Sequence, residues 1–174
     1  GEYSTTPITF DPTGKYILRK SSNSDFDFYQ FKSKTPKNLK VKDGQQYEFS
    51  PDGRRLVFQT PSGLSIYDPI SLKAIKEIPL KEIQDISISA QGLTAALLRD
   101  DQTIYIFDKD YQKTSTLTIP VEGHSDKIYW SPDGKYLIGI RNSTKRGESG
   151  PDFSIKIIDP RDGQVTSTLK GHAG

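Results

Sequence analysis

The sequence contains no cysteine, no methionine and only one tryptophan in 174 residues. Without cysteine the chain can form no disulfide framework and can offer no thiolate as a nucleophile or metal ligand. This absence does not by itself fix the cellular compartment. Methionine is missing even at position 1, so we expect the chain to be a processed product or a piece of a longer protein.

Long apolar runs and an excess of one charge are also missing. No stretch approaches the roughly 18 consecutive apolar residues of a membrane-spanning helix, and no N-terminal signal peptide is visible. The 24 basic and 22 acidic residues are interspersed and leave a net charge of +2. Because nucleic-acid binding needs a clustered basic face, we expect neither a nucleic-acid partner nor a membrane partner.

The aromatic content, in contrast, is sufficient for a folded core. Hydrophobic residues make up 33% of the chain and include nine tyrosines and eight phenylalanines. Each large ring buries much apolar surface, so we do not expect the chain to be disordered. Strands that bury one face and are joined by polar turns fit this composition, which favours an all-β protein.

A short segment recurs four times along the chain. Each copy is an alternating β run, a turn rich in proline, aspartate and glycine, and a second β run. Proline presets φ at the start of such a turn and glycine accepts a positive φ near its end, so each copy predicts a hairpin, with positive φ at Gly53 and Gly134. The turn glycines lie 39, 39 and 42 residues apart: Gly14, Gly53, Gly92 and Gly134.

Two further strands follow each hairpin, and no stretch has a convincing helical period. A repeat of about 40–45 residues with four strands is typical of a β-propeller blade. The sequence therefore predicts an all-β chain that forms one β-propeller segment of four tandem four-stranded antiparallel blades. The expected blades cover approximately residues 7–44, 45–80, 81–121 and 122–172.

The repeats resemble those of the WD40 family over nearly the whole chain. The third strand of each repeat ends in a pair that corresponds to the family's Trp-Asp dipeptide: Tyr29-Gln30, Tyr67-Asp68, Phe107-Asp108 and Ile158-Asp159. Gly123-His124 and Gly171-His172 resemble the family's Gly-His pair. No repeat has tryptophan at the family's position, and we expect Tyr67 and Phe107 to pack there instead. The turns also resemble TolB-type and dehydrogenase-type propellers.

This resemblance implies a non-catalytic scaffold for protein–protein interaction. Propellers contain about 4–8 blades, and a blade must pack against neighbours. Three arrangements stay open: a piece of a larger ring, two copies that close an eight-blade ring, and a closed four-blade ring. The expected partners are therefore other proteins or further blades, with self-association through open blade edges.

Motifs for catalysis are absent from the sequence. There is no glycine-rich phosphate loop and no His-Glu-x-x-His pattern, so we expect no enzyme activity, cofactor, metal or catalytic residue. His124 and His172 are interpreted as blade-stiffening or loop residues. Two alternatives stay open: a gating or dehydrogenase-type propeller domain beside an enzyme, and a scaffold associated with translation factors or nucleic acid.

One connection between the second and third strands of a repeat is much longer than its equivalents. It covers residues 142–152, whereas the equivalent connections are Pro61–Gly63 and Asp100–Gln102. The resemblance implies that these connections share a face with the loops that join one blade to the next, the usual partner-binding face. A tolerated surface insertion is the alternative, and the acidic residues could simply neutralise the basic ones. The predicted partner-binding residues are Arg141, Asn142, Lys145, Arg146, Glu148, Asp100, Asp101, Glu122, His124, Asp126 and Lys127.

The alternating pattern also predicts which side chains pack between blades. These side chains are apolar and have polar neighbours in the sequence: Phe49, Leu56, Ile66, Ile106, Trp130 and Ile157.

Overall fold

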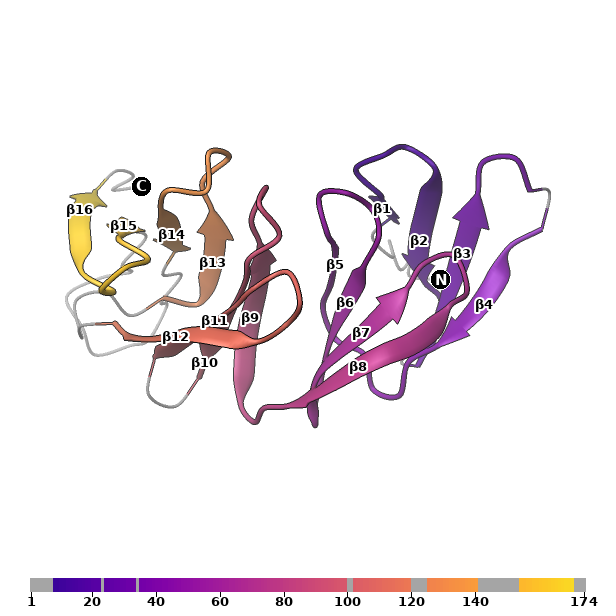
Figure 1. The fold of residues 1–174 in the computed structure, drawn as a ribbon, viewed down its shortest axis with the longest axis horizontal. Helices are drawn as coiled ribbons and strands as arrows, with labels where there is room; N and C mark the ends of the chain where they lie inside the picture. The colour runs from indigo at the N-terminus through magenta and orange to yellow at the C-terminus, as the bar shows by residue number, and fades with distance from the viewer. Residues whose placement is uncertain are drawn as a thin grey trace, which may run out of the picture. The chain divides into compact units, whose positions relative to one another are not determined.

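The computed structural model describes residues 8–22, 24–33, 35–99, 102–119, 125–140 and 154–170. Within these ranges the chain forms sixteen strands in four antiparallel four-stranded sheets (Figure 1). This confirms the predicted all-β class and the four tandem sheets. The chain divides into two compact units, residues 1–81 and 82–174. No helix among the described residues is long and apolar enough to cross a membrane.

The first unit contains two sheets whose strands are neighbours in chain order. The first sheet consists of β1 (Ile8–Phe10), β2 (Tyr16–Lys20), β3 (Asp25–Gln30) and β4 (Lys37–Lys40). The second sheet consists of β5 (Tyr47–Phe49), β6 (Leu56–Thr60), β7 (Gly63–Asp68) and β8 (Lys73–Pro79).

The second unit repeats this arrangement with two more sheets. The third sheet consists of β9 (Ile83–Ile88), β10 (Thr94–Leu98), β11 (Thr103–Phe107) and β12 (Lys113–Thr118). The fourth sheet consists of β13 (Lys127–Trp130), β14 (Leu137–Ile140), β15 (Ile155–Ile158) and β16 (Val165–Leu169).

The turn between the first two strands contains a glycine with positive φ in every sheet. Gly53 has a φ of 66° and Gly134 a φ of 70°, which confirms the predicted positive values. The Gly53 N–H donates to the carbonyl of Ser50, and the Gly134 N–H donates to the carbonyl of Ser131, each at 2.8 Å. Gly14 and Gly92 have the same conformation, with φ of 68° and 83°. Glycine is favoured at these positions because a Cβ is costly in this conformation.

A polar side chain closes each of these turns, a feature that the sequence analysis did not identify. The Ser50 hydroxyl accepts from the N–H of Arg55 at 2.9 Å, and the Ser131 hydroxyl accepts from the N–H of Tyr136 at 3.0 Å. The Asp11 carboxylate accepts likewise from the N–H of Tyr16, and in the third sheet, whose turn is one residue shorter, the Ser89 hydroxyl accepts from the N–H of Leu93 at 3.1 Å. Burial raises the pKa of Asp11, but the Thr13 hydroxyl and three backbone N–H groups outweigh it and lower that pKa overall.

The core of the first unit lies between its two sheets and is rich in aromatic rings. Phe26 and Phe58 are fully buried, with ring centroids 4.8 Å apart. Tyr67 packs edge-on against Phe58, with centroids 5.5 Å apart. The predicted core residues Phe49 and Leu56 belong to this cluster.

The core of the second unit lies between the third and fourth sheets. Ile106 and Trp130 are buried there, as predicted, and Ile66 is buried in the first unit. The prediction for Ile157 is wrong, because Ile158 fills the core position with no exposed surface. Ile157 is only half-buried on the opposite face of the fourth sheet. That face is not covered by another sheet of the second unit.

Candidate functional site

The structure places two of the predicted partner-binding residues, Asp126 and Lys127, at the start of β13. The other nine lie outside the described residues: Arg141, Asn142, Lys145, Arg146, Glu148, Asp100, Asp101, Glu122 and His124. Their predicted role is therefore still a prediction.

Hydrogen bonds bring together the described ends of the three predicted segments. The Gln102 carboxamide oxygen accepts from the backbone N–H of Ser125 at 2.7 Å. This bond joins the β10–β11 connection to the segment that leads into the fourth sheet. The N–H of Asp126 donates to the carbonyl of Ile140 at 2.8 Å, at the end of β14. These connections therefore start from one region at the edge of the second unit.

Asp126 and Lys127 are bonded to side chains of β9. The Lys127 ammonium lies 2.9 Å from a carboxylate oxygen of Asp85, and the Lys127 side chain is 45% exposed. The carboxylate of Asp126 accepts from the Gln84 amide at 3.2 Å. Both predicted binding residues thus also hold the third and fourth sheets together.

Two side chains of β9 bond directly to the backbone of β13. The second carboxylate oxygen of Asp85 accepts from the buried N–H of Ile128 at 2.8 Å. The Ser87 hydroxyl accepts from the N–H of Trp130 at 3.2 Å. Sequence reasoning missed both residues because polar side chains that alternate with isoleucine indicate a solvent-facing side. The only available signal was an aspartate immediately before the repeated β run.

Replacing Asp85 with alanine should destabilise the second unit by about 2–3 kcal/mol, because the buried Ile128 N–H would lose its acceptor. The matched change Lys127→Gln removes only the exposed partner of the pair and should cost less than about 1 kcal/mol. Urea unfolding followed by Trp130 fluorescence measures both, since Trp130 is the single tryptophan and lies in this core. Equal losses for the two variants would contradict this account of Asp85.

The aspartates that end the third strands stabilise local turns. Asp68 accepts from the N–H of Ile70 at 2.7 Å, and Asp108 accepts from the N–H of Gln112 at 2.8 Å. The Arg161 side chain donates to the Asp159 carboxylate and lowers its pKa to about 2. Among the described residues no three His, Cys, Asp or Glu side chains are grouped so that they could hold a metal ion.

Comparison with known proteins finds a partial sequence match to a WD-repeat protein. No protein-family model matches the chain. The chain is 31% identical over 91 residues to the human NACHT and WD repeat domain-containing protein 2. The matched region covers 49% of this chain and 5% of that protein. The chain thus spans a small part of this curated relative.

Two solved structures match nearly the whole chain. One is hydrazine synthase from Kuenenia stuttgartiensis, with a TM-score of 0.76, 21% identity, and coverage of 98% of this chain and 51% of that chain. The other is the mitotic checkpoint complex, with a TM-score of 0.73, 17% identity, and coverage of 99% and 52%. At these identities the structures show the fold alone, and this chain spans about half of each. The four sheets are therefore four blades of the β-propeller fold, in a chain similar in sequence to part of a WD-repeat protein.

Proposed function

We propose that the chain is a non-catalytic scaffold whose partner-binding surface is formed by the loops at the edge of blades three and four. The observation that carries the proposal is the pair of bonds Gln102–Ser125 and Asp126–Ile140, which anchor the stems of the three connections in one region. Loops on a rigid β scaffold are where binding residues concentrate. The likeness to a hydrazine synthase extends to fold only and assigns no reaction to these residues.

The proposed surface combines basic and acidic residues. Arg141, Lys145 and Arg146 supply donors suited to carboxylate groups, and Asp126 lies among the anchoring residues. An acidic segment of a protein partner is therefore the ligand that this surface would bind. The role of the loop charges is to orient the partner and speed its association.

Reversing two charges tests this surface. The double variant Lys145→Glu/Arg146→Glu should weaken binding of the protein that copurifies with the full-length protein by about tenfold at low salt, because like charges then face the partner. The loss should shrink as salt screens the exposed charges. Surface plasmon resonance with the purified partner measures both effects.

The matched control is Lys109→Glu/Lys135→Glu. These two exposed lysines lie in turns at the opposite end of the strands of the same unit, and their reversal should leave the affinity unchanged. If both double variants weaken binding equally, the effect is one of net charge. If neither weakens it, the long loop is a tolerated insertion and the proposed surface is wrong.

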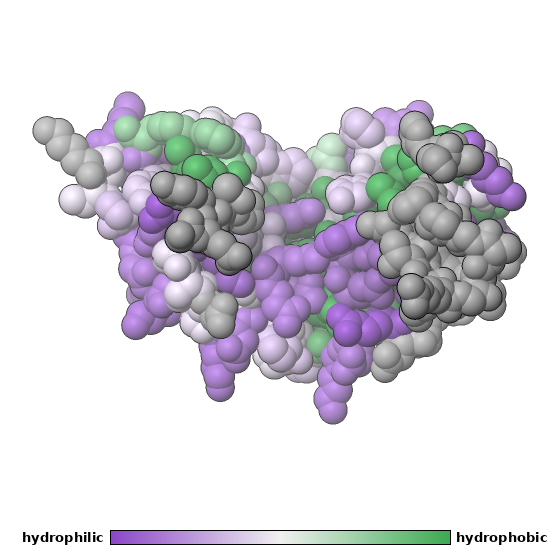
Figure 2. Space-filling model, turned by 180° about the vertical axis from the view of Figure 1, so that it is seen from behind, coloured by the Kyte–Doolittle hydropathy of each residue, from purple (hydrophilic) through white to green (hydrophobic). Residues whose placement is uncertain are grey.

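We also propose that further propeller blades cover the outer face of each terminal blade. On the first sheet, Phe10 and Phe31 are 61% and 56% exposed and stack on each other, away from the core of the first unit. On the fourth sheet, Tyr129, Ile155 and Leu169 are exposed on the face that also carries Ile157. Figure 2 shows hydrophobic surface on each unit. The matching solved chains are about twice as long as this one, which supports further blades as the elements that cover these faces.

The isolated 174-residue chain should therefore self-associate through these faces, because contiguous exposed apolar surface drives association. The double variant Phe10→Ser/Tyr129→Ser should sediment as a monomer where the unmodified chain does not. Ile70→Ser is the control, since Ile70 is 72% exposed but lies in a turn. Sedimentation velocity that shows a monomeric unmodified chain at every concentration would contradict the proposal that these faces need cover.

A further inference from the structure

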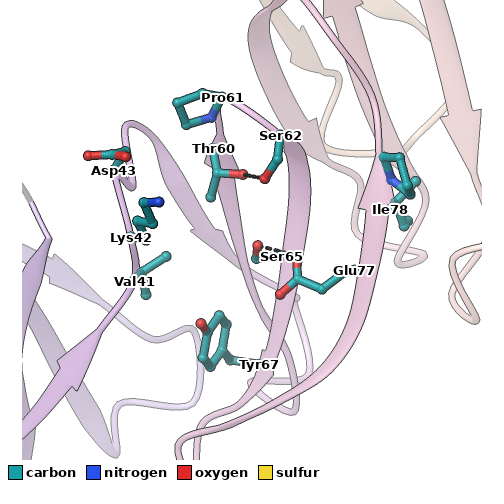
Figure 3. Close-up of a pocket in the computed structure, with 11 residues that line it drawn as sticks. Val41, Lys42, Asp43, Thr60, Pro61, Ser62, Ser65, Tyr67, Glu77 and Ile78 are labelled. Atoms are coloured by element: carbon teal, nitrogen blue, oxygen red, sulfur yellow. Dashed lines mark hydrogen bonds between the residues drawn. The ribbon is translucent and has the colours of Figure 1, made fainter.

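A cavity of about 560 Å³ lies within the first unit, between blades one and two. The segment that follows β4 forms one wall with Val41 and Lys42, and strands β7 and β8 form the other with Ser65, Tyr67 and Glu77 (Figure 3). Ligand sites typically occupy about 300–1,000 Å³. The cavity therefore has room for a side chain together with part of the peptide that carries it.

Glu77 supplies a negative charge to this cavity. One oxygen of its carboxylate accepts from the Ser65 hydroxyl at 2.5 Å, and Ser65 is itself only 5% exposed. The ion pairs formed by the described residues do not include Glu77. Its carboxylate is thus held in place by Ser65 and can still accept from a cationic ligand at its other oxygen.

An aromatic ring and an aliphatic side chain also line this cavity. Tyr67 is half-buried and is fixed by its edge-on contact with Phe58. Burial, with a smaller effect from the charge of Glu77, raises the pKa of the Tyr67 phenol. Val41 is almost fully buried on the facing wall. The cavity thus combines the exposed carboxylate of Glu77, which Ser65 holds, with apolar surface from Val41 and Tyr67, and Asp43 lines it as a second acidic residue.

We propose that this cavity binds an arginine side chain of a partner protein. The aliphatic stem would pack on Val41 and Tyr67, and the guanidinium would pair with Glu77. Arginine fits better than lysine because its planar group can stack on a ring while it donates to a carboxylate. The exposed ammonium of Lys42 lies on the opposite wall and opposes a cation. Removing that charge should therefore tighten binding.

The proposal depends on the scaffold function only in that the ligand belongs to a partner protein. N-acetyl-arginine amide is a suitable probe, with its neutral isostere N-acetyl-citrulline amide as control. Titration of the ¹⁵N-labelled chain at millimolar concentrations should shift the amide signals of Ser65, Tyr67 and Glu77 with the arginine probe and not with citrulline. Loop charge reversal at Lys145 and Arg146 should leave these shifts unchanged, so the two proposals fail separately.

Two variants complete the test. Glu77→Gln keeps an acceptor for Ser65 but removes the charge, and it should weaken probe binding by about tenfold. Lys42→Gln should strengthen it several-fold. Equal shifts with citrulline, or unchanged affinity of Glu77→Gln, would overturn the proposal. A preference for N-acetyl-glutamate amide that is lost in Lys42→Gln would also overturn it and would assign the cavity to an anion.

Discussion

Gly63→Ala is expected to destabilise the first unit by about 2–6 kcal/mol, because backbone strain and a steric clash add at this position. Gly63 starts β7 with a φ of 142°, where side chains are rarely tolerated. A Cβ there would lie 1.9 Å from the carbonyl oxygen of Ile78 and 2.7 Å from the nitrogen of Leu80. Both are backbone atoms of the paired edge strand and its end, so the clash cannot be relieved by a side-chain rotation.

Gly14→Ala separates strain from clash. Gly14 also has a positive φ, 68°, but no atom lies within 4 Å of the position of its missing Cβ. Its substitution should cost only about 1 kcal/mol. Amide hydrogen exchange in β6 and β7 measures the stability of this unit, which contains no tryptophan. Similar costs for the two substitutions would show that the close approach of β8 to Gly63 is not what makes glycine necessary.

Phe58→Ala should cost the first unit about 3–5 kcal/mol, the range for removal of a buried aromatic side chain. Phe58 has no exposed surface and contacts three rings, those of Phe26, Tyr47 and Tyr67, with centroids 4.8, 5.7 and 5.5 Å away. The variant leaves a cavity at the centre of this cluster. We expect faster amide exchange throughout both sheets of the unit and loss of the near-ultraviolet dichroism of its tyrosines.

Phe31→Ala is the matched control for Phe58→Ala. It removes the same side chain from the same unit, but Phe31 is 56% exposed and contacts only the equally exposed Phe10 among the ring pairs described. Its cost should stay below about 1 kcal/mol. If Phe31→Ala is as damaging as Phe58→Ala, the core of the unit is not the aromatic cluster between its two sheets.

The repeat made the strands predictable. The alternation and the glycine spacing located the hairpins because turn chemistry is local: each predicted turn glycine lies between the first two strands of a sheet and has a positive φ. The error at Ile157 has a different origin. Ile157 is equivalent to Ile106, whose face is covered by the fourth blade, whereas no blade of the second unit covers the face of Ile157. The burial of Ile157 depends on whether another blade packs on that face, and the alternation of apolar and polar residues within one strand contains no information about the next blade.

The candidate sites were less predictable than the fold. Asp85 contacts residues more than forty positions later in the chain, and Glu77 faces the segment that follows β4. Neither pairing leaves a local pattern, because both depend on how one blade packs on the next. The charge pattern of the long loop did indicate a candidate surface, since a local insertion is visible in the sequence. The nine loop residues of that prediction lie outside the described residues.

Three of the bonds between blades three and four share a direction, with a side chain of blade three as acceptor and a backbone N–H group of blade four as donor. A backbone donor is the same whatever side chain follows it, proline excepted. Through these three bonds, blade three contacts features of its successor that every non-proline residue shares. Substitutions other than proline at Ser125, Ile128 or Trp130 keep the donors of these three bonds, whereas changes at Asp85, Ser87 or Gln102 remove the acceptors. After duplication of a blade, the side chains at these donor positions could change while the three bonds to the preceding blade are kept. Lengthening of the chain by repeat duplication is therefore compatible with stable packing between neighbouring blades.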